Sequence, residues 1–204
     1  MIKLIIELKK ENTELRKQLN EMKDKINLLF DSLYMSNLDS LIINNNKEYN
    51  KILKGWINPF KNLKCELLYR LSRDGDTKST FHQLCDNKGP TLTLYEMEDG
   101  NKIGFYTPLS WDSQSEFKSD LETFMFSLTK FQKYKKLTSS CSIYCHYSCG
   151  PWTKGFGCDV ESIKKLRIIN VINSYFDGGI NILQGINSGW TVFNVKELEV
   201  FKII

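Results

Sequence analysis

The sequence lacks a strong excess of charge of one sign, and it also lacks a long hydrophobic run. Its 28 basic and 24 acidic residues leave a net charge of only +4, so no basic field over the whole chain demands a nucleic-acid partner. No apolar run of about 18 residues predicts insertion into a membrane. The N-terminal residues carry Lys and Glu throughout, unlike a secretory signal. We therefore expect a protein with reduced thiols in the cytoplasm, with the nucleus as an additional location.

The sequence also lacks the usual motifs for phosphate and for zinc. No glycine-rich segment is followed by the Lys-Ser/Thr pair of a Walker motif. Four of the six cysteines lie close together in the sequence, but they are not spaced like the paired knuckles of a structural zinc site. If Cys141 and Cys145 share a strand, about 13 Å separates them, which is too far for one ion. The other two cysteines of this group are Cys149 and Cys158. We expect no metal site and no cofactor.

Residues 1–33 carry a heptad repeat without Gly or Pro, which predicts a coiled coil. The polar Asn12 at position a favours a parallel two-stranded state, and Glu11 at g can pair with Arg16 at e of a second chain. The alternative is that this helix packs on its own C-terminal domain. The predicted dimerisation residues are Leu8, Asn12, Leu15, Leu19, Met22, Ile26 and Leu29.

Residues 34–49 are rich in Ser and Asn and predict a linker, although their leucines and isoleucines could extend the helix. The apolar spacing from Ile52 to Ile57 predicts a short helix that ends at Pro59. We therefore expect one globular domain over residues 50–204.

The start of that domain predicts a strand, a turn, a helix, a second turn and a second strand. The helix would place Phe81 and Cys85 on one face, and Thr77 or Ser79 could cap its N-terminus. Both turns are rich in Asp, Gly and other turn-forming residues. They are Ser72-Arg73-Asp74-Gly75 and Asp86-Asn87-Lys88-Gly89-Pro90.

The rest of the domain mostly predicts strands. Short runs rich in aromatic and β-branched residues occur at 91–97, 101–107, 123–128 and 190–195. Glu98-Asp99-Gly100-Asn101 is a good hairpin turn between the first two. The pattern predicts an α+β fold built on packed antiparallel sheets.

Several segments taken in order resemble the TLDc family. They are the Ser-Arg-Asp-Gly turn, the passage from Cys85 through Asp86, Gly89 and Pro90 to Leu94, the strand from Gly104 followed by Trp111, Ser119-Asp120 with 124–128, and the closing strand 193–201. The resemblance covers roughly residues 50–204. It implies a two-sheet antiparallel β-sandwich flanked by short helices.

The resemblance also implies a function. It implies a non-enzymatic protein of oxidative-stress protection that acts by protein–protein binding, with the vacuolar-type proton ATPase as the family's best-attested partner class. The residues that match the family's motifs, and are therefore binding candidates, are Ser72, Arg73, Asp74, Gly75, Asp86, Gly89, Pro90, Trp111, Glu197 and Glu199.

Two glutamates of the closing strand allow a hydrolase hypothesis, which we favour least. Glu197 and Glu199 would project to one face, about 6.6 Å apart, and inverting glycoside hydrolases place two carboxyl groups at such a separation. Glu122 is a further weak candidate. We favour a structural or partner-binding role, with Arg73 as the cation that pairs with one glutamate. Simple alternation also places Val195 on the face of these glutamates.

Thiol chemistry at Cys85 is a second hypothesis, because a reactive thiol needs a nearby cation or helix N-terminus, and Lys88 and His82 are close in sequence. We favour a buried structural cysteine, since Cys85 continues the apolar face of the helix.

DNA binding by a dimer is the alternative from a different class. Basic residues interleave with the aromatic Phe131 and Tyr134, and such patches can neutralise phosphates while rings stack on bases. A second basic patch follows later in the chain. The candidate residues are Lys130, Lys133, Lys135 and Lys136, and then Lys164, Lys165 and Arg167.

Overall fold

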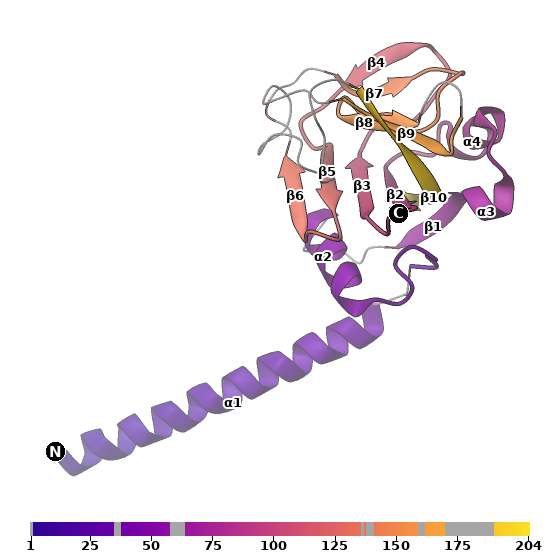
Figure 1. The fold of residues 1–204 in the computed structure, drawn as a ribbon. Helices are drawn as coiled ribbons and strands as arrows, with labels where there is room; N and C mark the ends of the chain where they lie inside the picture. Colours follow the sequence, from indigo (N-terminus) through magenta and orange to yellow (C-terminus); the bar gives the residue numbers. More distant parts are fainter. Residues whose placement is uncertain are drawn as a thin grey trace. The chain divides into compact units, whose positions relative to one another are not determined.

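The computed structural model describes residues 2–34, 38–57, 64–135, 137, 141–158, 162–169 and 190–204. The chain divides into two units, Met1–Asn37 and Leu38–Ile204. In the first unit, α1 (Ile2–Tyr34) is a single helix of 33 residues, which Figure 1 shows at the N-terminus. The helix that the heptads predict is thus present, while the coiled coil itself stays a prediction.

The second unit, which we call the compact unit, combines short helices with antiparallel strands (Figure 1). Its helices are α2 (Lys47–Ile57), α3 (Leu71–Asp74) and α4 (Lys78–Cys85). Its strands are β1 (Cys65–Arg70), β2 (Thr91–Met97), β3 (Lys102–Thr107), β4 (Glu116–Ser119), β5 (Phe124–Ser127), β6 (Gln132–Lys135), β7 (Cys141–Cys145), β8 (Phe156–Cys158), β9 (Lys165–Ile169) and β10 (Trp190–Ile203).

The strands form one large sheet and one small sheet. The large sheet has the order β6-β5-β3-β2-β10-β9-β8, with β1 also paired to β10, and the small sheet is β4-β7. All of these strand pairs are antiparallel. The predicted α+β class with two antiparallel sheets and short helices is therefore confirmed, although the second sheet has only two described strands.

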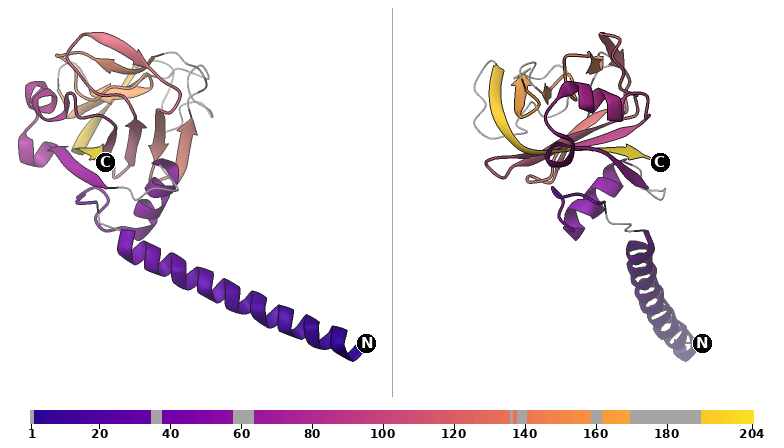
Figure 2. Two further views of the ribbon diagram at one scale, coloured as in Figure 1. Left: turned by 180° about the vertical axis from the view of Figure 1, so that it is seen from behind. Right: turned by 90° about the vertical axis from the view of Figure 1, so that its right-hand side faces the viewer.

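Strand β10 holds the large sheet together because it pairs with three others. Residues 195–202 pair with β2, residues 199–203 pair with β1, and residues 190–194 pair with β9. Figure 2 shows this strand, in yellow, bending along its length. The bend lets the β9 end of the sheet curl over the β2–β3 face.

A β-bulge in β10 corrects our prediction about which residues share a face. The pairing with β2 shifts between Val195 and Glu197, and an extra residue in one strand moves every later side chain to the other face. Val195 therefore packs in the same cluster as Leu198 and Val200, whereas Phe201 packs in another. Glu199 and Phe201 do not share the face of Val195.

Two hydrophobic clusters lie on the two faces of the large sheet. Strand β2 serves both, because its side chains alternate: Leu92 and Leu94 pack in one cluster, and Tyr95 and Met97 pack in the other. The cluster around Tyr95 is rich in aromatic residues, including the fully buried Trp111. A central strand buried on both faces explains why no charged residue occurs between Thr91 and Tyr95.

The segment predicted as a linker belongs to the compact unit, which begins at Leu38 rather than at residue 50. Ile42 and Ile43 are buried in the core. The asparagines that suggested a linker serve as turn residues, since Asn44 adopts a left-handed backbone conformation with φ of 46°. The side chain of Asn46 then accepts hydrogen bonds from two backbone N–H groups at the start of α2.

Two local predictions are confirmed. Thr77 caps α4, because its hydroxyl oxygen accepts a hydrogen bond from the N–H of Thr80 at 3.2 Å. The turn between β2 and β3 closes as a hairpin, in which the N–H of Gly100 donates to the carbonyl of Met97 at 2.9 Å. Gly100 has a φ of 84°, a conformation that glycine adopts without strain.

Candidate functional site

Glu199 sits at the centre of a fully satisfied buried network. Its side chain is inaccessible to solvent, and Arg70 Nε lies 2.8 Å from one carboxylate oxygen. That oxygen also accepts from the N–H of Leu41 at 2.9 Å, and the other accepts from the hydroxyl of Ser40 at 2.5 Å. The network ties the start of the compact unit to β1 and β10.

Arg70, rather than Arg73, is therefore the cation that pairs with the closing strand, which corrects our prediction. Arg70 lies directly opposite Glu199 in the β1–β10 register, so its side chain has a short path to the carboxylate. Arg73 instead donates from two nitrogens to Asp74, each at 2.8 Å, and it also donates to the carbonyl of Leu68. The sequence alone does not single out Arg70, because the register of β1 with β10 is seen only in the folded chain.

The turn that opens the domain is held mainly by its own residues. The hydrogen bond from Arg73 holds the pKa of Asp74 below its usual range. Asp74 also accepts a hydrogen bond from the N–H of Arg70 at 2.8 Å, and the N–H of Ser72 donates to Glu197 at 3.2 Å. Gly75 follows with a φ of 85°. The turn is a structural element that also reaches Glu197.

Glu197 and Glu199 do not form an open carboxylate pair. Glu197 is 6% exposed and accepts from the N–H groups of Ser72 and Leu198, while Glu199 is fully buried. Glu122 is exposed and lies before β5 instead. A general acid or base must be within hydrogen-bond reach of its substrate, so the pair does not offer the geometry of a glycoside hydrolase.

The second group of motif residues gathers around Trp111. Asp86 and Trp111 form a β-bridge, and the ring nitrogen of Trp111 donates to the hydroxyl of Thr91 at 3.0 Å. The N–H of Gly89 donates to Ser110 at 3.0 Å. The carbonyl of Pro90 accepts from the N–H of Ile203 at 2.9 Å. These residues fix α4 and β2 to the 110–113 segment.

His82 extends this group to the segment after β7. One ring nitrogen lies 2.9 Å from Asp86, and the other lies 3.0 Å and 2.9 Å from the carbonyl oxygens of His146 and Cys149. A carbonyl oxygen only accepts, so the second nitrogen carries a hydrogen. Nothing in the sequence pattern singles out this long-range contact.

Burial works against thiol reactivity at three of the cysteines. Burial raises the pKa of Cys65 to about 12 and that of Cys145 to about 11, and it raises the pKa of Cys85 well above its ordinary value. The thiolate is the reactive form, so these shifts oppose peroxide chemistry at the three cysteines. Within the described parts of the chain, no cluster of His, Cys, Asp and Glu could hold a metal ion.

Replacing Cys85 by alanine should cost on the order of 1 kcal/mol of stability and leave intact the protection against peroxide that the family resemblance implies. The expected loss is small because the change removes one sulfur atom from a fully buried site. Cys85→Ser should cost more, since it buries a hydroxyl among apolar side chains. Thermal melts and a peroxide-survival assay check both variants. Full loss of protection in a normally folded Cys85→Ala protein would instead show thiol chemistry.

The described basic candidates lie in or next to two separate strands of the large sheet, β6 and β9. Those around β6 are separated in the sheet order from those around β9 by β5, β3, β2 and β10. Lys133 donates to the carbonyl of Trp56 at 2.8 Å and lies 3.8 Å above the ring of Phe124. Lys164 lies 3.5 Å from the carboxylate of Asp76. Tyr134 is buried, so its ring is not open to a base. Lys136 falls outside the described residues.

A row of stacked rings on the small sheet was missed by sequence reasoning. Phe117 of β4 stacks on Tyr144 of β7 at a centroid distance of 4.4 Å. His146 follows at 5.4 Å and Tyr147 at a further 4.4 Å. Phe117 and Tyr147 are 62% and 65% exposed. The only sequence signal was the spacing of two residues between Tyr144 in β7 and His146 directly after that strand. We call these four residues the aromatic row.

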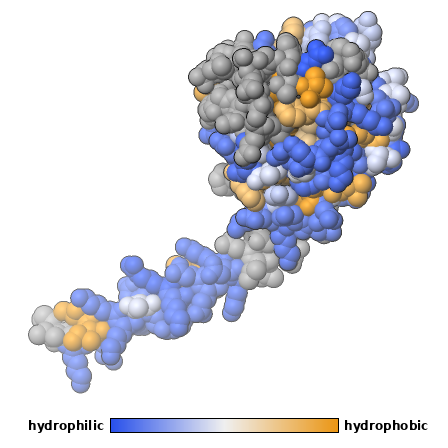
Figure 3. Space-filling view, in the orientation of Figure 1, coloured by the Kyte–Doolittle hydropathy of each residue, from blue (hydrophilic) through white to orange (hydrophobic). Residues whose placement is uncertain are grey.

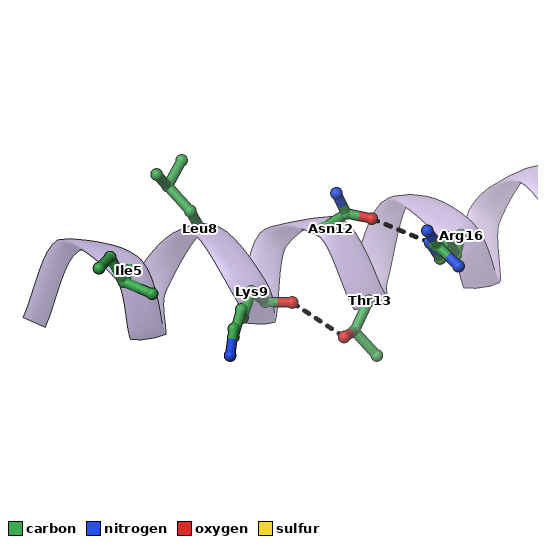
Figure 4. A pocket seen from close by; sticks show the side chains of 6 residues that line it. All are labelled: Ile5, Leu8, Lys9, Asn12, Thr13 and Arg16. Carbon is green, nitrogen blue, oxygen red and sulfur yellow. Dashed lines mark hydrogen bonds between the residues drawn. The ribbon is translucent and has the colours of Figure 1, made fainter. Parts of the chain in front are cut away.

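The first unit carries an exposed groove along α1. Ile5, Leu8, Lys9, Asn12, Thr13 and Arg16 line it, as Figure 4 shows. Apolar side chains come to the surface there among hydrophilic ones (Figure 3). No described helix is long and apolar enough to cross a membrane.

A comparison with protein families identifies the compact unit. The family model for the TLDc domain matches residues 38–204, the same residues that form the compact unit. No curated protein matches the chain.

Proposed function

Because the chain belongs to the TLDc, or oxidation-resistance, family over residues 38–204, we propose that it protects against oxidative stress by binding another protein rather than by catalysis. The burial of Glu197, Glu199 and Cys85 supports this proposal. These side chains hold the fold, and their polar groups already have partners or are shielded from reactants.

The aromatic row is the observation that carries the proposal. Aromatic residues are enriched where proteins bind one another, and exposed apolar patches often mark such sites. Phe117 is an exposed phenylalanine on a short strand, with Tyr144, His146 and Tyr147 stacked beside it. We propose that this row contacts the protein partner.

The partner that we propose is the vacuolar-type proton ATPase, which the family resemblance implies. Binding to its cytosolic part places the protein in the cytoplasm. Affinity capture from cells with and without peroxide should then recover ATPase subunits.

Replacing both Phe117 and Tyr147 by alanine should reduce recovery of the ATPase at least about tenfold, because large aromatic side chains are typical binding hot spots. The matched control is Phe131→Ala, which removes another exposed phenylalanine from the turn before β6. Equal recovery with the double variant and with the wild type would contradict a role for the aromatic row.

DNA binding remains the alternative function. The observation that favours it is the exposure of Lys164 and Lys165 at the start of β9. A shift of DNA that weakens steeply with salt would support this alternative. Absence of ATPase subunits from the capture, together with such a shift, would replace the adaptor proposal.

Self-association through α1 is also part of the proposal. An adaptor with two identical binding units gains avidity for a partner that offers two sites. The exposed apolar side chains of α1 support this association.

A further inference from the structure

Helix α1 carries an apolar seam along one side, interrupted at one a position by Asn12. Seven apolar side chains in the described part of α1 are each 46% to 58% exposed, and six of them, all except Ile6, form the seam. These six recur at the a and d positions of the heptads, so they line one narrow side of the helix. The six residues are Ile5, Leu8, Leu15, Leu19, Met22 and Ile26.

We propose that a second copy of this chain covers the seam, forming a parallel, in-register two-stranded coiled coil that makes the protein bivalent. The dimer depends only on α1. The gain in avidity from two binding units rests on the adaptor function proposed above.

The groove on α1 has the composition of a hole for a side chain of the second copy. Coiled-coil side chains pack as knobs into holes made by four residues of the facing helix. Ile5, Leu8, Lys9 and Asn12 occupy positions a, d, e and a, and all four line the groove. In a parallel, in-register dimer this hole receives the partner copy's residue at the same d position, which is leucine. Figure 4 shows Leu8 projecting from this side of the helix.

Asn12 favours the parallel orientation over the antiparallel one. In a parallel, in-register dimer, a positions face a positions, so the two Asn12 amides meet and can bond to each other. In an antiparallel dimer, a positions face d positions, and the amide would lie against an apolar side chain without a partner, which is costly. Within one chain Asn12 Oδ1 already accepts from Arg16 Nε at 3.0 Å. A carbonyl oxygen has a second lone pair, so it can still accept from the other copy.

The charges beside the seam favour the same orientation. The e positions hold Lys9, Arg16 and Lys23, which are all cations. An antiparallel dimer would bring e positions together and create repulsion along the helix. A parallel dimer instead brings e opposite g, where Glu11 can pair with Arg16 of the other copy.

The parallel orientation has a consequence for binding. Only residues 35–37 lie between α1 and the start of the compact unit. In a parallel dimer both compact units leave the coiled coil at the same end. Two units held together in this way can engage neighbouring sites with higher avidity than one unit.

The first experiment compares the masses of two double variants of the full chain by light scattering at tens of micromolar. Leu8→Lys with Leu15→Lys adds two charges at d positions, where they would face the same introduced lysines of the second copy. Ile6→Lys with Thr13→Lys adds the same charges at the same spacing, but off the seam. We expect twice the chain mass of 23.8 kDa for the wild type and for the control, and the single-chain mass for the seam variant. Unchanged melting of the compact unit would show that the seam variant folds.

The second experiment determines orientation by oxidative cross-linking of Leu8→Cys and Met22→Cys, each as a single variant. Two cysteines at facing positions of a parallel dimer are close enough for a disulfide, so each variant should cross-link to itself. Wild type treated in the same way accounts for the six native cysteines. In an antiparallel dimer, residues 8 and 22 cannot both lie opposite the same residue of the second copy. A monomeric wild type, a trimer or tetramer, or cross-linking only in a mixture of the two variants would overturn the proposal. None of these results depends on ATPase binding.

Discussion

Replacing Arg70 by alanine should destabilise the compact unit by about 3–5 kcal/mol. Glu199 is fully buried, and the guanidinium of Arg70 lies 2.8 Å from its carboxylate. Without Arg70, Glu199 keeps its hydrogen bonds from Ser40 and Leu41 but loses this neighbouring positive charge. Urea unfolding followed by tryptophan fluorescence measures the loss.

Arg73→Ala is the matched control, because it removes the same side chain three residues later. Arg73 is 46% exposed and pairs with its sequence neighbour Asp74. Exposed ion pairs contribute little, so we expect a loss of about 1 kcal/mol or less. Equal losses for the two arginine variants would contradict the structural assignment and favour the pairing that the sequence suggested.

A double variant tests whether Arg70 acts through Glu199. Glu199→Gln removes the buried charge while keeping a similar shape. The loss for Arg70→Ala with Glu199→Gln should therefore be smaller than the sum of the two single losses, as expected for groups in contact. Strictly additive losses would show that the two side chains stabilise the fold independently.

The features that the sequence predicted correctly depend on residues close together in the chain. The helix α1, the Thr77 cap and the Gly100 turn are each determined by residues within a few positions of one another. The family motifs added the sheet architecture, which local patterns specify only in part. These features account for most of the strands and helices of the compact unit.

The features that could not be predicted depend on distant contacts. The hydrogen bond between Arg70 and Glu199 joins residues 129 positions apart, and only the β1–β10 register distinguishes Arg70 from Arg73. The bulge after Val195 changes the face of each later side chain. Ser40 was typical of a linker residue. Nothing near it in the sequence indicates that its hydroxyl donates to the buried carboxylate of Glu199.

The aromatic row could not be predicted for the same reason, because its formation depends on the register between two strands. Phe117 and Tyr144 lie 27 positions apart, and they stack because β4 pairs with β7 at those positions. The spacing of two residues between Tyr144 and His146 could have suggested that their rings lie on one side of the chain. It could not have supplied Phe117, so the candidate binding surface appears only in the folded chain.

Gly104→Ala should strongly destabilise the compact unit, because among the glycines of the described residues Gly104 leaves the least room for a Cβ. A Cβ at this position would lie 2.3 Å from the carbonyl oxygen of Thr93 and 2.6 Å from a ring carbon of Phe126. The ring could tilt, but the carbonyl belongs to the neighbouring strand β2, whose shift would disturb the centre of the sheet. We expect a loss above about 4 kcal/mol, which is exceptional for one substitution.

Gly55→Ala is the matched control, because the same methyl group is added where nothing lies within 4 Å. Gly55 is exposed in α2, and alanine is favoured over glycine in a helix by about 1 kcal/mol. The control should therefore raise the melting temperature, whereas Gly104→Ala should lower it sharply or prevent folding. The opposite signs separate close packing at Gly104 from any general effect of replacing glycine. A normal melting temperature for Gly104→Ala would mean that β2 and β3 do not approach each other as closely as the structure shows.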